Sequence, residues 1–278
     1  MFKKISIIGV GLIGGSIALQ SKRKRLAKEI WGFFRNKERL EKALRLKVID
    51  KASLNLGEVI KDSDFVILSL PVLKIIEYLD KIKDFLKKDT IITDVGSTKK
   101  EILKEAKKKL KGFNFVASHP FTGSEKRGFE NSEEVKWENS ICFVCTDSVC
   151  TKQAYRKVKI FWKKLGAQII EIDSGYHDKL VGAVSHLPHL ISYSLINSLD
   201  ANFLKIAPQS FKSLTRIAGS PESVWSDIFF TNRKNILYFL DKFLKELLVF
   251  KKTLEIQDAL KIKKIIKKAN RKRFIYIK

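Results

Sequence analysis

The chain has four histidines, and each lies in a segment with other polar residues suited to proton chemistry. His119 belongs to "SHPFTGSE", while His177, His186 and His189 fall within "HDKLVGAVSHLPH". The pKa of an unperturbed imidazole lies close to neutrality, so histidine is a natural general base for an alcohol that loses a hydride. The histidines therefore suggest oxidation of a hydroxyl-bearing carbon.

Each of these residues also has a purely structural alternative. His119 could satisfy a buried backbone group at a strand end, and His186 or His189 could be polar residues of a helix core. Ser97, in "DVGS", could simply cap a helix that begins at Thr98. Taken singly, none of them decides between catalysis and structure.

A glycine loop near the N-terminus indicates where the hydride could go. The apolar run Ile5 to Ile8 enters Gly9-Val10-Gly11-Leu12-Ile13-Gly14 and continues as an apolar helical pattern. Gly9 allows a tight turn, Gly11 lets the backbone approach a pyrophosphate, and Gly14 allows close packing of helix on strand. Phosphates would sit at the helix N-terminus, where free N–H groups favour an anion. Such loops also occur for conformational reasons, but the strand–turn–helix context favours a dinucleotide site.

The residue expected to select the dinucleotide is missing. About twenty residues past the last glycine, NAD-binding folds carry an acid that binds the adenosine ribose, and here Phe34 occupies that position within "WGFFRN". Without a carboxylate, the neighbouring Arg35 could pair with a 2′-phosphate. This pattern predicts NADP in preference to NAD. The alternative is that Arg35 is only a solvated charge, since Lys and Arg number 55 of 278 residues.

The elements that must position these residues alternate between strands and helices. Strand-like runs "EIWGFF", "DFVILSLP", "TIITDVGS", "FNFVASHP", "SICFVCT" and "QIIEID" are separated by helical patterns up to about Asp173, and only helical patterns follow. Such alternation predicts an α/β fold with a parallel, doubly wound sheet. We therefore expect a Rossmann-like dinucleotide-binding domain at 1–173 and a helical substrate and dimerisation domain at 174–278.

Ligands in open parallel sheets bind at the carboxyl ends of the strands. The ends here deliver three segments that would converge on a nicotinamide ring: "SLPV" from Ser69, "DVGS" from Asp94, and "SHPFTGSE" from Ser118. The predicted cofactor contacts are Gly9, Gly11, Leu12, Ile13, Gly14, Phe34, Arg35, Ser69, Pro71 and Ser97.

Composition excludes several other classes. With 45% hydrophobic residues, the chain can bury a substantial core, and no apolar run reaches the eighteen or so residues needed to cross a bilayer. We expect a cytoplasmic protein that does not act at a membrane. Cys142 and Cys145, three apart on a strand, would point to opposite faces, and with Cys150 they read as free thiols rather than a metal site.

The net charge of +25 could indicate a nucleic-acid-binding protein. However, the lysines are spread over nearly every predicted helix, and no recognised nucleic-acid module accompanies them. Only Lys261 to Lys278 forms a concentrated basic segment, and its isoleucines at helical spacing suggest a packed helix. We therefore expect no nucleic-acid partner.

Taken together, the motifs are more specific than any one of them. "GVGLIGGS", "DVGSTK", "SHPFTGSEKRG", "HDKLVGAVSHLPH" and "LTRIAGSPESVWSDIF" resemble, in order and spacing, the prephenate/arogenate dehydrogenase family of tyrosine biosynthesis. The resemblance covers essentially the whole chain. It implies an N-terminal nucleotide-binding domain and a C-terminal helical domain that forms a homodimer.

The resemblance also implies roles for individual residues. His119 matches the catalytic histidine that polarises the substrate's ring hydroxyl as hydride leaves. Ser97 matches the serine that hydrogen-bonds this histidine and the hydroxyl. Arg216 matches the arginine that binds a substrate carboxylate, and its bidentate guanidinium suits that task.

Five further residues match family positions around the substrate. His189 resembles a second substrate-contacting histidine, while Glu125 and Trp225 match the pocket entrance and wall. His177 and His186 match family histidines, and we expect them among the substrate contacts. Ser213 is a departure from the family pattern, because some relatives carry an acidic residue at this position.

The implied reaction is the oxidative decarboxylation of prephenate to 4-hydroxyphenylpyruvate. Because the product ring is aromatic, the protein need only orient and polarise the substrate. Arogenate, giving tyrosine directly, is the alternative substrate. A non-catalytic nucleotide-sensing protein is the alternative from another functional class. A dehydrogenase that acts on another hydroxy acid is a further alternative, but the motifs "SHLPH" and "TRIA" would not be expected in such an enzyme.

Overall fold

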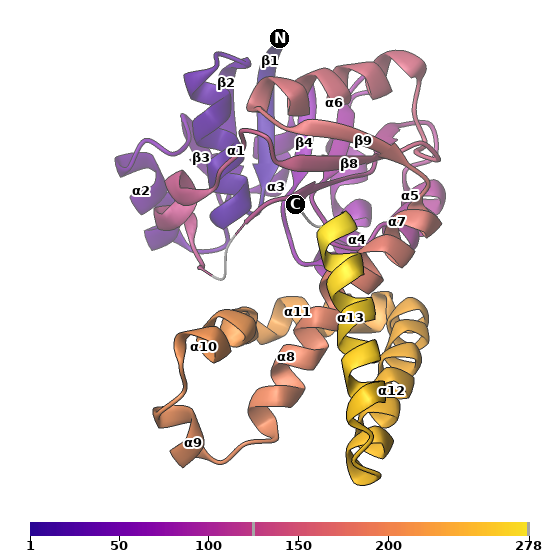
Figure 1. Ribbon diagram of the computed structural model, residues 1–278. Coiled ribbons are helices and arrows are strands. Elements are labelled where there is room, and N and C mark those ends of the chain that lie inside the picture. The colour runs from indigo at the N-terminus through magenta and orange to yellow at the C-terminus, as the bar shows by residue number, and fades with distance from the viewer. Residues whose placement is uncertain (124–125, 277–278) are drawn as a thin grey trace.

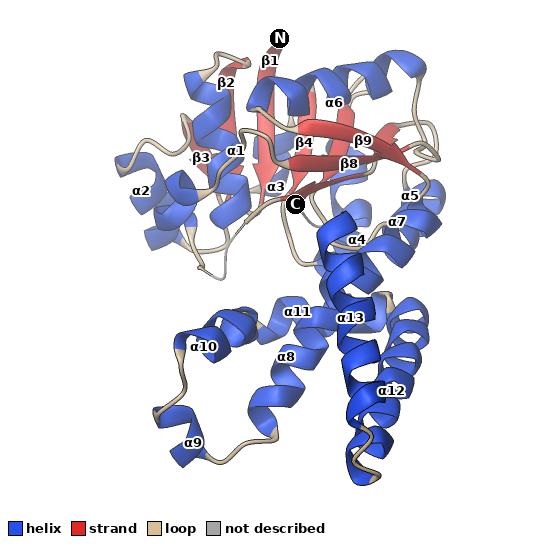
Figure 2. Cartoon of the chain, in the orientation of Figure 1, coloured by secondary structure: helices blue, strands red, loops and turns tan. Residues whose placement is uncertain are grey.

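Strands and helices alternate over the first 172 residues, and the described residues that follow form helices and no strand (Figure 2). The structure is a computed structural model that describes residues 1–123 and 126–276. We call residues 1–172 the sheet domain and residues 174–276 the helical domain. The two lie one above the other in Figure 1, joined by the helix that follows the last strand.

The main sheet has six parallel strands in the order β3-β2-β1-β4-β5-β6. They are β1 (Phe2–Ile8), β2 (Ala27–Phe33), β3 (Lys51–Ser53), β4 (Phe65–Leu68), β5 (Ile91–Asp94) and β6 (Asn114–Val116). The order reverses between β1 and β4, which is the doubly wound arrangement that opens a ligand crevice at that point. The predicted fold class is confirmed.

Helices cover both faces of this sheet, which explains the uniformly apolar strands. They are α1 (Leu12–Arg23), α2 (Lys37–Arg45), α3 (Leu56–Ile60), α4 (Val72–Ile82), α5 (Lys100–Lys109) and α6 (Lys152–Leu165), with 3₁₀ turns at Lys83–Phe85 and Phe129–Glu134. Successive residues of β4 alternate between two buried clusters: Phe65 and Ile67 pack into one and Val66 and Leu68 into the other. The sheet is therefore the middle layer of three.

A second sheet corrects the prediction of one continuous parallel sheet. It contains β7 (Ser118–Phe121), antiparallel to β8 (Ile141–Cys145), which is parallel to β9 (Gln168–Ile172). The segment "FNFVASHP", expected as one strand, is divided at Ala117 between β6 and β7. Ala117 N donates to Ser148 Oγ (3.0 Å), and its carbonyl accepts from Cys145 N (2.9 Å). These bonds take the chain out of the main sheet just before His119.

The helical domain begins with an almost continuous rod. It comprises α7 (Ser174–Val181), a π-helical turn (Gly182–His186) and α8 (Leu187–Asn197). The remaining elements are α9 (Ala201–Lys205), α10 (Gln209–Thr215), a 3₁₀ turn (Arg216–Gly219), α11 (Glu222–Thr231), α12 (Arg233–Glu255) and α13 (Ala259–Tyr276). The long periodic stretch at the end is thus two helices, because the chain turns at Gln257, whose φ is 52°. They form the hairpin at the lower right of Figure 1.

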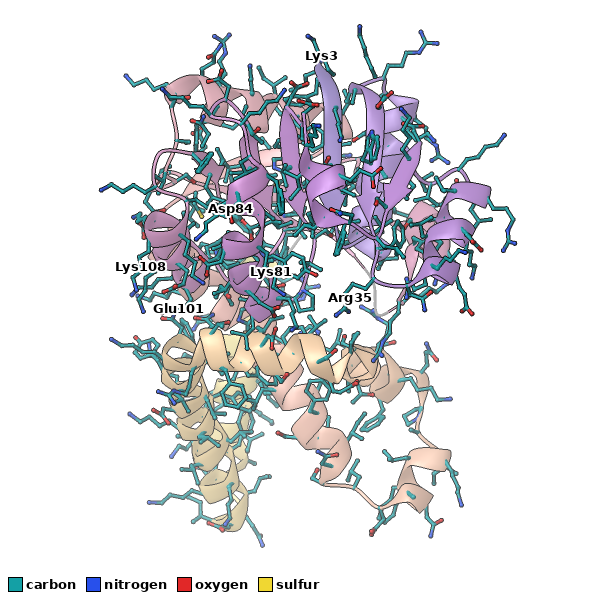
Figure 3. The ribbon with its side chains drawn as sticks, turned by 180° about the vertical axis from the view of Figure 1, so that it is seen from behind. Lys3, Arg35, Lys81, Asp84, Glu101 and Lys108 are labelled. Carbon is teal, nitrogen blue, oxygen red and sulfur yellow. The ribbon has the colours of Figure 1, made fainter. Side chains whose placement is uncertain are left out.

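Hydrogen bonds fix the helical domain against the carboxyl ends of the main sheet. Leu73 N donates to Asp227 Oδ2 (3.1 Å), and the hydroxyls of Thr98 and Thr231 lie 2.9 Å apart. In Figure 3, Arg35 and Lys81 lie along this edge of the sheet domain, whereas Lys3 lies at its far end. Within the described residues, no helix is both long and apolar enough to cross a membrane.

Candidate active site

A cavity of about 550 Å³ lies between the sheet edge and the helical domain. Seven of the predicted site residues line it: Leu12, Ile13, Ser97, His119, His189, Arg216 and Trp225. They come from six separate parts of the chain, from the start of α1 to α11. Folding therefore gathers side chains over two hundred residues apart around one space.

His119 lies on the sheet-domain wall of this cavity, on β7, and only 6% of its surface is exposed. The rings of Phe121 and Phe143 pack against it at centroid distances of 5.5 and 6.2 Å. Burial, with smaller effects from His177 and Lys99, holds the pKa of His119 well below its ordinary value. The imidazole is therefore neutral at neutral pH and can accept a hydrogen bond or a proton.

Behind His119, away from the cavity, lie His177 and Asp178 at the start of α7. His119 Nδ1 is 3.0 Å from His177 Nε2, and His177 Nδ1 is 2.9 Å from Asp178 Oδ1. His177 is completely buried and does not line the cavity. The expectation of direct substrate contact is wrong for His177, because its ring is buried against the rings of His119 and Phe143.

A buried ion pair connects Ser97 with the strand that carries His119. Lys99 Nζ donates to Asp94 Oδ2 and to Ser118 O, the latter at 2.8 Å. Asp94 also accepts from Gly96 N (2.8 Å) and Ser118 N (3.2 Å). Both charged side chains are fully buried; burial raises the pKa of Asp94 and the ammonium of Lys99 opposes that rise. The pair therefore ties the Ser97 loop to β7.

Ser97 is not the cap of the following helix. Helix α5 starts at Lys100, and its first N–H groups are satisfied from another domain: Asp178 accepts from Lys99 N (2.7 Å) and Lys100 N (3.0 Å). Ser97 is half-buried and lines the cavity. Its hydroxyl is therefore positioned for a ligand rather than for helix capping.

The helical-domain wall is built around Trp225 on α11. The ring of His189 stacks on it with centroids 3.5 Å apart and an interplanar angle of 22°. His189 Nδ1 is 3.0 Å from Ser185 O, so this nitrogen donates and Nε2 is the acceptor. Burial lowers the pKa of His189. His189 follows the π-helical turn and Pro188 in the chain, and π turns recur at functional sites.

His186 does not reach the cavity either. It is 1% exposed, lies edge-on to Trp225 at 5.8 Å, and its Nδ1 accepts from Asn232 Nδ2 (3.0 Å). Burial lowers its pKa to about 3. The expected substrate contact is therefore wrong for His186 as well: it is a core histidine that supports Trp225.

Arg216 lies at the start of the 3₁₀ turn that follows α10 and lines the cavity with an exposed side chain. Lys126 also lines it, on the sheet-domain side, and sequence reasoning passed over this residue although it belongs to "SHPFTGSEKRG". Both cations suit an anionic ligand. Glu125, predicted at the entrance, lies outside the described residues, and Ser213 is exposed on α10.

The glycine loop fits a dinucleotide. Gly9 has a φ of 96°, and a Cβ on Gly14 would lie 2.3 Å from Gly9 O, so both positions require glycine. A Cβ on Gly11 would meet no protein atom within 4 Å, which leaves the space that a pyrophosphate needs. No side chain caps the N-terminus of α1, and its N–H groups are available to phosphate oxygens.

A second cavity, of about 180 Å³, lies beside this loop at the end of β2. It is lined by Gly9, Phe33, Phe34, Arg35, Asn36, Arg39, Leu70 and Tyr78. Ser69 and Pro71, predicted as cofactor contacts, line neither this cavity nor the larger one. Ser69 N instead donates to Ile8 O (2.8 Å), and Pro71 precedes α4.

The charged groups in the lining of this second cavity are the guanidinium groups of Arg35 and Arg39. Phe34 is buried and packs edge-on against Phe129 at 6.3 Å. Arg39, which sequence reasoning missed, lies over the same Phe129 ring at 5.3 Å. Arg35 and Arg39 thus flank one space that has no acidic side chain in its lining, and they suit a phosphate.

Metal-dependent chemistry was not expected, and no group of three or more His, Cys, Asp or Glu is arranged to hold a metal ion within the described part of the chain. Cys142 and Cys145 are buried and Cys150 is half-buried, all as free thiols.

Comparison with known proteins gives matches along the whole chain. A family model described as the nucleotide-binding domain of prephenate dehydrogenase matches residues 17–171, and one described as its dimerization domain matches residues 173–268. The chain is 32% identical to the prephenate dehydrogenase of Bacillus subtilis over 92% of this chain and 71% of that protein. It is 28% identical to the cyclohexadienyl dehydrogenase of Zymomonas mobilis, covering 93% and 91% of the two chains.

A solved structure is also similar along its full length. It is the prephenate dehydrogenase from Aquifex aeolicus in complex with hydroxyphenyl propionate and NAD+. The TM-score is 0.91 and the identity 29%, with 99% of this chain and 98% of that chain covered.

Proposed function

This chain belongs to the prephenate dehydrogenase family, and from that membership we propose that it catalyses the oxidative decarboxylation of prephenate to 4-hydroxyphenylpyruvate with an NAD(P) cofactor. The observation that carries the proposal is the joint lining of one cavity by His119, Ser97, His189 and Arg216, beside the N-terminus of α1. A neutral base, a hydroxyl and a guanidinium are the groups that an anionic alcohol substrate requires.

The balance of the reaction defines what the protein must do. A hydride leaves the hydroxyl-bearing ring carbon, the ring carboxylate leaves as carbon dioxide, and the electron pair of the broken C–C bond completes the aromatic ring. The bound nicotinamide supplies the hydride acceptor. No net proton is consumed, because any proton that His119 takes from the hydroxyl returns to the phenolic oxygen.

Each residue then has a defined task. His119 accepts the hydrogen bond of the ring hydroxyl and stabilises positive charge that develops as hydride leaves. Ser97 orients the same hydroxyl, and Arg216 holds a carboxylate through its planar fork. Trp225 and His189 form a flat, stacked wall that excludes water from one side of the ring.

The direct experiment is an assay of the purified protein with prephenate and NAD(P). We expect reduced nicotinamide and 4-hydroxyphenylpyruvate to form in equal amounts. Cofactor binding without turnover would instead favour a nucleotide-sensing protein. Arogenate serves as the comparison substrate, because turnover of arogenate alone, with tyrosine as product, would replace prephenate in the proposal.

For the cofactor we propose a preference for NADP over NAD. Support comes from Phe34 at the position of the expected acid and from Arg35 and Arg39 at the second cavity. The paired guanidinium groups would hold a 2′-phosphate, and no carboxylate in this cavity lining would repel it.

The preference is tested by initial rates with NADP and NAD at equal concentrations. Replacing both Arg35 and Arg39 with alanine should raise the KM for NADP by about tenfold or more, the value of a charge-assisted hydrogen bond, and leave the KM for NAD nearly unchanged. Arg45→Ala, at the far end of α2, is the matched control. If the wild-type protein instead prefers NAD, Arg35 has no role in cofactor selection and the proposal is wrong.

We also propose that the chain forms a homodimer through its helical domain. Apolar side chains there have more than half of their surface exposed: Phe203, Ile206, Leu214, Leu248, Leu254 and Leu260. Exposed apolar area on this scale marks an interaction surface, and the matching family model carries a dimerization description. Light scattering should give twice 32.0 kDa, and a monomer at micromolar concentration would contradict the proposal.

A further inference from the structure

We propose that His177 and Asp178 are positioning residues that fix the tautomer of His119, so that its Nε2 presents a lone pair to the substrate. This inference rests on the proposed function and deepens it. The hydrogen-bonded row runs from the cavity inward: His119 Nδ1 to His177 Nε2 at 3.0 Å, then His177 Nδ1 to Asp178 Oδ1 at 2.9 Å.

The direction of the row follows from Asp178. A carboxylate only accepts hydrogen bonds, and Asp178 already accepts from the backbone N–H groups of Lys99 and Lys100. His177 Nδ1 must therefore carry the proton of the third bond. A neutral imidazole has one N–H, so His177 Nε2 is an acceptor.

The proton positions on His177 also determine those on His119. Because His177 Nε2 accepts, His119 Nδ1 must donate, and the remaining nitrogen of neutral His119, Nε2, has no proton. His119 lines the cavity, and its Nδ1 is used by His177. The nitrogen left for a substrate hydroxyl is therefore an acceptor.

The hydrogen-bonded row of His119, His177 and Asp178 also places a negative charge near His119, whose other titratable neighbours oppose its protonation. Around His119 the nearby titratable groups are His177, Lys99 and His186, all of which lower its pKa. Burial lowers the pKa of His177, and among the charged groups around it Asp178 and Asp94 raise that pKa while Lys99 lowers it. Asp178 thus supplies the negative charge that offsets a transient positive charge on His119 through the intervening ring.

A purely structural role has to be separated from this one. Asp178 also caps α5, because its carboxylate accepts from the backbone N–H groups of Lys99 and Lys100, so its replacement would disturb folding. His177 is the better position, because its ring nitrogens serve the row and its ring packs against Phe143 at 5.2 Å.

The test compares His177→Gln, His177→Phe and the packing control Phe161→Leu, which alters a buried aromatic of the sheet-domain core. A glutamine carbonyl can accept from His119 Nδ1 while its amide donates to Asp178, so His177→Gln should keep kcat within about tenfold. His177→Phe should lower kcat by about 100-fold with the KM for prephenate changed less than about threefold. Phe161→Leu should change kcat by less than about threefold.

Two results would overturn the proposal. One is a His177→Phe enzyme with near-normal kcat, and the other is an equal loss in His177→Gln and His177→Phe. Nitrogen-15 NMR of labelled histidine gives a readout that does not depend on turnover: wild-type His119 should carry its proton on Nδ1, and a proton on Nε2 would refute the assignment. Absence of prephenate turnover in the wild type would remove the proposed function while leaving the tautomer measurable.

Discussion

Replacing Lys99 with methionine should destabilise the sheet domain by several kcal/mol although it removes no apolar contact. Methionine keeps most of the length of the side chain but leaves the carboxylate of Asp94 without its counter-charge. Lys99 and Asp94 are both fully buried, so water cannot replace the lost partner. Ser118 O loses its 2.8 Å hydrogen bond from the ammonium as well.

The magnitude follows from this burial. Removing one partner of a buried ion pair costs about 3–5 kcal/mol, which is a large share of the roughly 5–15 kcal/mol that stabilises a typical protein. The double variant Asp94→Asn with Lys99→Met should recover part of the loss, because no buried charge remains. Lys108→Met, on the helix α5 that follows Lys99, removes an exposed ion pair with Glu105 and should cost less than about 1 kcal/mol.

Urea unfolding measures these differences through the fluorescence of Trp137 and Trp162, both fully buried in the sheet domain. Burial raises the pKa of Asp94, and without Lys99 only the backbone N–H groups of Gly96 and Ser118 still oppose that rise. A folded-state pKa above the unfolded value makes stability fall as pH rises through it, so the deficit should be larger at pH 8 than at pH 5. A Lys99→Met protein as stable as the Lys108→Met control would refute the reasoning.

Three further predictions concern catalysis and pH. His119→Asn should lower kcat by about 100-fold or more while the Kd of the cofactor stays unchanged, and near-normal turnover would remove His119 as the base. Arg216→Ala should raise the KM for prephenate by about 10- to 100-fold, as expected for a lost charge-assisted hydrogen bond; an unchanged KM would place Arg216 outside the substrate site. Burial lowers the pKa of His177 and of His186, so the unfolded chain binds protons below about pH 6.5 while the folded chain does not. The free energy of unfolding should therefore fall as pH is lowered from 7 to 5, and constant stability over that range would contradict these shifts.

Sequence patterns were sufficient for the parts of the fold that depend on local interactions. The glycine loop, the strand and helix that flank it, and the change from alternating elements to helices alone are encoded in the spacing of neighbouring residues. Gly9, Gly11 and Gly14 could be assigned mechanical roles because backbone geometry within six residues determines them. The motif resemblance then indicated which side chains to inspect.

Only the tertiary structure decided which of those side chains face the cavity. His119 and His177 are 58 residues apart in sequence, and Asp178 reaches back 79 residues to cap α5; no local pattern predicts such pairs. The division of "FNFVASHP" at Ala117 likewise depends on hydrogen bonds to Ser148 and Cys145. The burial of a side chain depends on how the whole chain packs, which local sequence patterns do not specify. The sequence therefore predicted four histidines at the site, whereas in the folded protein His119 and His189 line the cavity and His177 and His186 lie in the core behind it.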